Sequence, residues 1–165
     1  MVNQDLPLRP PRHRVERRAV LLWVVRALSA LLPLAAALTV VHLLWAAARG
    51  WTGPALVVLA VAGPVYAVVM PLWRYAVHRW EATDDAVYAA TGWFVREWRI
   101  APVSRIQTVD TVRGPAEQLL GLATLTVTTA SSSGAILIRG LAPAVAAEAA
   151  ERLSEITRRT PGDAT

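Results

Sequence analysis

Two long runs of apolar residues dominate the first half of the chain. From Ala27 to Ala48 the only ionisable side chain is His42, and from Trp51 to Trp73 there is none. A helix of 23 residues, the length of the second run, spans roughly 34 Å, slightly more than the hydrocarbon core of a bilayer. The pattern therefore predicts a membrane region over 19–73, with helices at about 23–48 and 51–73 joined by a short external turn.

Aromatic and basic residues mark the ends of these runs. Two pairs of tryptophans each lie 22 positions apart, the spacing expected of the aromatic belts at the two membrane surfaces. Arginines near the same levels can reach the headgroups with their long side chains. The predicted membrane-interface residues are Trp23, Arg26, Trp45, Trp51, Trp73 and Arg74.

The orientation follows from the arginines that flank the apolar runs. Segment 1–18 carries five arginines against two acids, and Arg74 and Arg79 follow the second run, whereas the connecting turn has only Arg49. Because arginine-rich segments that flank membrane spans usually stay on the cytoplasmic side, 1–18 is predicted to be a basic cytoplasmic tail. Both termini are then cytoplasmic, in a multi-pass protein of the plasma (inner) membrane. A cleaved signal peptide is the alternative for the first run, but the run exceeds an apolar region of about 7 to 15 residues.

Beyond Trp73 the period changes from helical to alternating. Short alternating runs separated by turn residues predict six or seven antiparallel strands, and a helical pattern resumes at Pro143. The runs that predict strands are 74–83, 86–92, 93–102, 104–114, 124–129 and 135–141. The fold expected is α+β: a two-helix transmembrane hairpin, then a small antiparallel β-barrel or sandwich over 74–158 with a C-terminal helix. Residues 159–165 are predicted to be a disordered tail.

In two predicted helices, the C-terminal one and a short one before the strand at 124–129, the apolar positions predict which face is buried. Val145, Ala149, Leu153 and Ile156 form one stripe of the C-terminal helix. The stretch GPAEQLLGL, 114–122, predicts a short connecting helix that starts at a proline. Its three leucines, Leu119, Leu120 and Leu122, are expected to face the core.

The ordered set of these motifs resembles a known family. The Arg-Tyr pair at 74–75, the Gly92 turn into an aromatic strand, Arg-Ile-Gln at 105–107 and Leu-Leu-Gly-Leu at 119–122 before a threonine-rich strand are its most specific parts. Behind two apolar spans, they resemble the bacterial pleckstrin-homology-like (PH-like) domain of YdbS-like membrane proteins, over roughly 12–158. The resemblance implies a β-barrel of pleckstrin-homology type near the inner leaflet. It carries over no catalytic site.

Composition excludes several chemistries. The chain has no cysteine, which excludes disulfides, thiolate zinc sites and cysteine nucleophiles. Its three histidines, at 13, 42 and 78, lie in the tail, a span and a strand, without metal-ligand spacing. Asp84 and Asp85 are neighbours in a turn, with no general acid or base beside them. We therefore expect no enzyme, no cofactor and no metal.

The net charge of the C-terminal domain limits the classes of partner that the domain is expected to bind. From residue 74 to the end there are ten arginines and ten acids, so the domain lacks the basic excess typical of nucleic-acid binding. A neutral domain tethered to the bilayer favours a membrane-anchored interaction domain that assembles with itself or with other membrane proteins. The alternative is recognition of anionic lipid headgroups. Its candidate residues are Arg96, Arg99, Arg105 and Arg113, which could instead pair with Glu97, Asp110 and Glu117.

Overall fold

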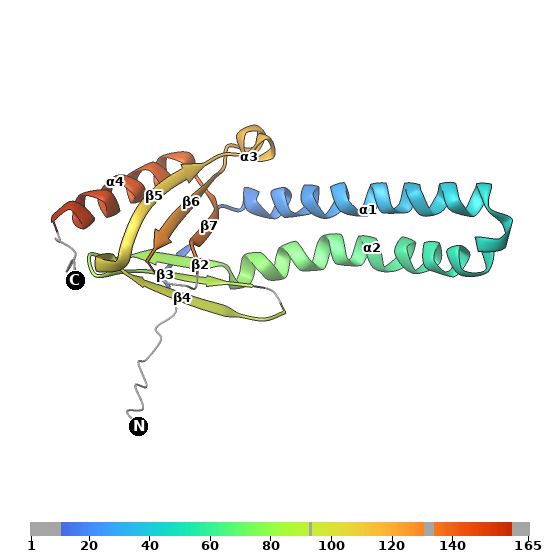
Figure 1. Cartoon of the computed structure of the whole chain (residues 1–165), viewed down its shortest axis with the longest axis horizontal. Coiled ribbons are helices and arrows are strands. Elements are labelled where there is room, and N and C mark those ends of the chain that lie inside the picture. Colours follow the sequence, from blue (N-terminus) through green and yellow to red (C-terminus); the bar gives the residue numbers. More distant parts are fainter. Residues whose placement is uncertain (1–10, 93, 131–133, 160–165) are drawn as a thin grey trace, which may run out of the picture. The chain divides into compact units, whose positions relative to one another are not determined.

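The computed structural model describes residues 11–92, 94–130 and 134–159, and these residues form two compact units. One unit, 17–76, is a helical hairpin; the other combines 11–16 with the residues from 77 onwards (Figure 1). Residues 160–165 of the predicted tail, the predicted turn at Ser131–Ser133 and Trp93 lie outside the described residues, as does the segment before residue 11.

The hairpin unit consists of α1 (Arg18–Leu44), the short 3-10 helix η1 (Ala46–Ala48) and α2 (Arg49–Val77). Both long helices are apolar and long enough to cross a membrane. Ala27, Ala67 and Met70 are buried against one another, with Leu31 packed on them. Large side chains on the other faces are exposed, including Leu44 at 83% and Val61 at 68%. The two alanines at this contact and the large apolar residues outside it are typical of helices that pack in lipid.

α2 continues four residues beyond the predicted end at Trp73. The expectation of a strand starting at Arg74 is therefore wrong, since Arg74–Val77 is helical and the strand starts at Arg79. The sequence RYAV alternates only briefly, and a run this short has no distinct helical or strand period.

The second unit contains two antiparallel sheets in the described residues. Sheet A has the order β1-β2-β3-β4, and sheet B has the order β5-β6-β7 (Figure 1). The strands of sheet A are β1 (His13–Arg14), β2 (Arg79–Ala82), β3 (Ala86–Thr91) and β4 (Glu97–Pro102). Those of sheet B are β5 (Ile106–Val112), β6 (Ala123–Thr129) and β7 (Ile136–Leu141). The sheets are not closed into a barrel, so the sandwich is the form that the fold adopts.

Three helical segments connect or cover the strands. The 3-10 helix η2 (Val103–Arg105) joins the two sheets, α3 (Pro115–Leu120) joins β5 to β6, and α4 (Pro143–Arg159) follows β7. α4 contacts β5, β6 and η2, and Figure 1 shows it lying along sheet B. Arg159 is the last residue of this helix, one position into the segment expected to be disordered.

The segment before α1 is part of the domain and not only a tail. His13 pairs with Trp80 and Arg14 with Arg79, so β1 and β2 are neighbouring antiparallel strands. The whole helical hairpin, 17–76, is thus inserted between two adjacent strands of one sheet. The backbone N–H of Glu16 also donates a hydrogen bond of 2.8 Å to the carbonyl of Gly140 at the end of β7.

The core lies between the two sheets and under α4. Leu125 and Val127 are fully buried, which confirms the face predicted for the threonine-rich strand. Other buried members are Val87, Ala89, Ala101, Ile136, Ile138, Leu141, Ala146, Ala149 and Leu153. The stripe of α4 is rotated slightly from the prediction, because Ala146 is buried whereas Val145 is 39% exposed.

Candidate functional site

The four arginines proposed for headgroup binding do not converge on one site. Arg105 lies in η2 directly before β5, whereas Arg113 follows the last residue of β5. β5 has 7 residues, and at a rise of about 3.3 Å per residue its ends are separated by roughly 20 Å. A single headgroup cannot contact residues at both ends of such a strand.

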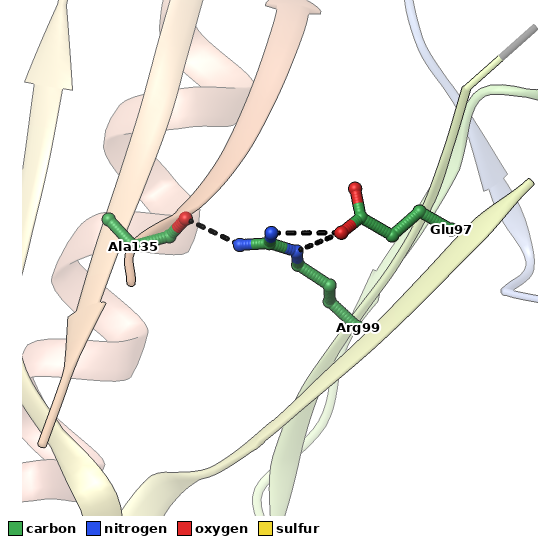
Figure 2. A network of polar contacts seen from close by, with 3 residues as sticks. All are labelled: Glu97, Arg99 and Ala135. Atoms are coloured by element: carbon green, nitrogen blue, oxygen red, sulfur yellow. Dashed lines mark hydrogen bonds and ion pairs between the residues drawn. The ribbon is translucent and has the colours of Figure 1, made fainter. Parts of the chain in front are cut away.

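Arg99 is engaged within the domain. Its Nε and Nη2 atoms donate hydrogen bonds of 3.1 and 2.9 Å to Oε1 of Glu97, and Nη1 donates one of 3.2 Å to the carbonyl of Ala135. Figure 2 shows the guanidinium between these two partners, one on β4 and the other just before β7. Arg99 therefore links the two sheets, which fits the predicted pairing with Glu97.

Arg113 and Glu117 belong to a network around α3. Arg113 Nε donates to the carbonyl of Leu122 at 3.1 Å. Glu117 is only 4% exposed: its Oε2 accepts a hydrogen bond from the backbone N–H of Gly114 at 2.8 Å, and its Oε1 accepts one from Oγ1 of Thr124 at 2.9 Å. The carboxylate thus joins the start of α3 to β6, as the acidic partner of a helix cap does.

The leucines of α3 divide differently from the prediction. Leu122 is fully buried and Leu120 is partly buried, but Leu119 is 89% exposed, so its expected position in the core is wrong. The buried residue of α3 is Glu117, whose carboxylate accepts hydrogen bonds from Gly114 and Thr124.

Arg96 differs from the other three arginines because it lies in the exposed turn between β3 and β4. Two exposed apolar residues precede it: Phe94 at 85% and Val95 at 74%. Gly92 opens this turn with φ at +108°, and a Cβ there would lie 1.9 Å from the carbonyl oxygen of Val95. Only glycine fits this close approach.

The face of sheet A that points away from the core carries a second apolar surface. Trp98 and Ile100 on β4 are 40% and 41% exposed, and Ile100 pairs directly with the partly buried Tyr88 on β3. We call Tyr88, Trp98 and Ile100 the outer strip. β4 is an edge strand of its sheet in the described part of the chain. Sequence alternation placed Trp98 and Ile100 on one face but gave no signal that the face is exposed.

The predicted membrane-interface residues occupy both ends of the hairpin unit. The guanidinium carbon of Arg74 lies 5.0 Å from the ring centroid of Trp23, which is a cation–π contact near the end of the hairpin that joins the domain. Trp23 is buried, whereas Trp45, Trp51 and Trp73 are 61%, 55% and 51% exposed. Arg26 is exposed as well.

One polar contact joins the helices at the opposite end of the hairpin. Nδ1 of His42 lies 2.8 Å from Oγ1 of Thr52, and that hydroxyl donates to the carbonyl of Ala48 at 2.9 Å. Arg49 caps α1 by donating to the carbonyls of His42 and Leu43. The contact has the character of a structural link, because Thr52 is fully buried.

Comparison with known proteins identifies this architecture. A family model described as "Bacterial PH domain" matches residues 19–158, a range that includes both apolar helices except Arg18 and all the described strands except β1. The chain belongs to the bacterial PH-domain family. Within this match the two apolar helices precede the sheet-forming residues of a single PH-like domain, as the sequence motifs predicted.

A curated relative of this bacterial PH-domain protein is also a membrane protein by name. The chain is 26% identical over 155 residues to the "UPF0699 transmembrane protein YdbS" of Bacillus subtilis (strain 168), which covers 90% of this chain and 92% of the relative. No solved structure matches the chain significantly. The resemblance to YdbS-like membrane proteins is thereby confirmed.

The bacterial PH-domain protein also has a small cleft between β2 and α4. It measures about 210 Å³ and is lined by His13, Trp80, Ala82, Val145, Glu148, Ala149 and Arg152. The ring centroids of His13 and Trp80 lie 5.6 Å apart, and Arg152 also pairs with Asp84 at 2.7 Å. No group of three or more histidines and acids in the described residues is placed to hold a metal ion.

Proposed function

We propose that this protein displays a PH-like interaction domain on the cytoplasmic face of the plasma membrane, where the domain assembles with a second copy or with another membrane protein. The outer strip is the proposed contact surface. The observation that carries the proposal is the exposure of Trp98 and Ile100, 40% and 41%, on one face of an edge strand. Aromatic residues of this kind are enriched at the centres of protein interfaces.

The pairing of β1 with β2 supports the proposed topology. These strands precede and follow the helical hairpin and lie side by side in sheet A. Strands that pair must be on the same side of the membrane, which requires an even number of crossings between them. Two spans satisfy that requirement, and the arginine-rich flanks favour the cytoplasmic side.

The edge strand supports protein binding by a second route. An edge strand offers backbone N–H and C=O groups to an incoming strand, and flanking side chains can add selectivity. Because the domain is tethered to the bilayer, a partner in the same membrane meets it at high effective concentration. A modest apolar strip is then sufficient for assembly.

Recognition of a headgroup by the four arginines has less support. Arg105 and Arg113 lie at opposite ends of β5, and Arg99 donates three hydrogen bonds within its own domain. Headgroup recognition needs several basic groups to converge near the membrane. The arrangement therefore favours assembly over headgroup recognition as the main activity.

Site-directed cross-linking tests the proposal on the full chain in membranes. The natural absence of cysteine allows an Ile100→Cys variant to carry one photo-cross-linker, with Glu151→Cys on the exposed side of α4 as the matched control. We expect Ile100→Cys to cross-link to a differently tagged copy or to another membrane protein, and Trp98→Glu to abolish the adduct. Equal adducts from both positions, or adducts to lipid alone, would contradict the proposal.

A further inference from the structure

The chain enters and leaves the helical hairpin at one end of sheet A. Three residues, 15–17, separate Arg14 of β1 from the start of α1, and only His78 separates the end of α2 from Arg79 of β2. Arg14 pairs with Arg79, which pairs in turn with Ala90 near the end of β3. The turn between β3 and β4 therefore lies at the end of the sheet to which both membrane helices are covalently joined.

The end of sheet B that carries α3 is hydrogen-bonded to the segment that leads from β1 into α1. Glu16, two residues before α1, donates its backbone N–H to the carbonyl of Gly140. The next residue of β7, Leu141, pairs with Ala123 at the start of β6, and α3 ends three positions before Ala123. Two separate protrusions, the β3–β4 turn and α3, thus share this end of the domain.

Both protrusions expose large apolar side chains. In the described part of the β3–β4 turn, Phe94 is 85% and Val95 is 74% exposed, and Leu119 on α3 is 89% exposed. These exposed fractions exceed those of Trp98 and Ile100 in the outer strip, 40% and 41%. Arg96 directly follows Val95 in the sequence and is exposed as well. Exposed apolar residues next to an arginine are typical of segments that lie at a membrane interface.

The opposite end of sheet A is polar. The turn between β2 and β3 contains the exposed Asp84 and Asp85, and Asp84 pairs with Arg152 at 2.7 Å. This turn exposes no large apolar side chain that could enter a headgroup region. The exposed apolar side chains therefore lie at the end of the sheet that is covalently joined to the membrane helices.

The β3–β4 turn is built as a defined structure. The φ of +108° at Gly92 and the approach of Val95 to the glycine fix the backbone on which Phe94 and Val95 are exposed. The two apolar residues of this turn that the structure describes, Phe94 and Val95, are both exposed, so a turn specified this closely has a use for them outside the core.

We infer that Phe94, Val95 and Leu119 insert into the headgroup region of the bilayer that the protein's own helices occupy. Arg96 lies beside the lipid phosphates. This contact holds that end of the domain at its membrane, and it uses residues other than the outer strip. Because the helices already keep the domain at the surface, a shallow apolar contact that would be too weak for a free domain is occupied.

Fluorescence of the full chain in liposomes tests the inference. A single Val95→Cys variant carries an environment-sensitive dye, and Asp85→Cys at the opposite end of the same sheet is the matched control. The lipids are mixtures of neutral and anionic phospholipids, with or without nitroxide-labelled acyl chains. We expect the dye at 95 to be quenched by the labelled lipid and protected from aqueous iodide, and the dye at 85 to behave in the opposite way.

The other outcomes separate the inference from the proposed assembly. Quenching of both dyes by iodide to the same extent would overturn it. Protection at 95 without quenching by lipid would also overturn it, since the turn would then contact protein. A Leu119→Cys variant repeats the test on an exposed residue of the second protrusion, so damage to one turn cannot decide the result. Cross-linking at Ile100 remains informative whichever result is obtained.

Discussion

Replacement of Glu117 by alanine tests the idea that α3 is fastened by a buried carboxylate. The change removes the acceptor for two donors, the N–H of Gly114 at 2.8 Å and Oγ1 of Thr124 at 2.9 Å. Hydrogen bonds to a charged group each contribute about 1.5–3 kcal/mol. Thr124 is only 7% exposed, so water replaces its lost partner poorly. We expect Glu117→Ala to lower the free energy of opening of sheet B by about 3 kcal/mol.

Hydrogen exchange of the full chain in detergent measures this free energy directly. Peptides covering β6 report the opening of sheet B, because native-state exchange follows local as well as global unfolding. The matched control is Leu119→Ala on the same helix, which removes an 89% exposed side chain and should change stability by less than about 0.5 kcal/mol. The reasoning fails if the leucine variant is destabilised as much as the glutamate variant. A double variant with Thr124→Val should lose less than the sum of the two single changes.

Three further changes test other parts of the fold. Gly92→Ala places a Cβ 1.9 Å from the carbonyl of Val95 at a φ of +108°, so we expect the β3–β4 turn to rearrange, measured as faster amide exchange in that turn alone. His42→Ala removes the 2.8 Å contact to Thr52, and we expect a loss of about 0.6 kcal/mol in the hairpin's stability, measured by steric trapping in micelles. Arg99→Gln removes the link between β4 and the start of β7, and we expect faster proteolysis between the sheets; an unchanged rate would show that the link is dispensable.

Long apolar runs and alternating strands could be predicted because each is encoded locally. Two long apolar helices, the threonine-rich strand and the helix after Pro143 are all present, although the first helix covers Arg18–Leu44 where the sequence predicts about 23–48. The end of α2 was misplaced because the four residues after Trp73 have no decisive period. Local pattern therefore gives the type of an element more reliably than its last residue.

Features that depend on distant partners could not be predicted in this way. β1 has only 2 residues, and its partner strand lies beyond the whole helical hairpin, so the preceding sequence reads as a charged tail. Glu117 reads as a surface residue until Thr124 and the N–H of Gly114 are placed beside it. Leu119 reads as a core residue, yet its side chain is 89% exposed. In both residues of α3 the tertiary fold sets an environment opposite to the residue's usual preference.

The candidate site shows the same division. Sequence identified four exposed or partly exposed arginines, but their separation along β5 and the pairing of Arg99 follow only from the fold. The exposure of Phe94 and Val95 depends on a turn whose place at one end of sheet A is set by strand register. Such register is not visible in a single sequence.

We propose that a single cytoplasmic domain forms from the segment before the membrane hairpin and the residues after it. Labelling of single cysteines with a membrane-impermeant reagent in intact cells tests it most directly, at Arg12, Gly50 and Asp85 of the otherwise cysteine-free chain. The account predicts that Gly50→Cys is labelled in intact cells, and that Arg12→Cys and Asp85→Cys are labelled only after the membrane is permeabilised. Labelling of Arg12→Cys and Asp85→Cys on opposite sides of the membrane, or of both in intact cells, would contradict it.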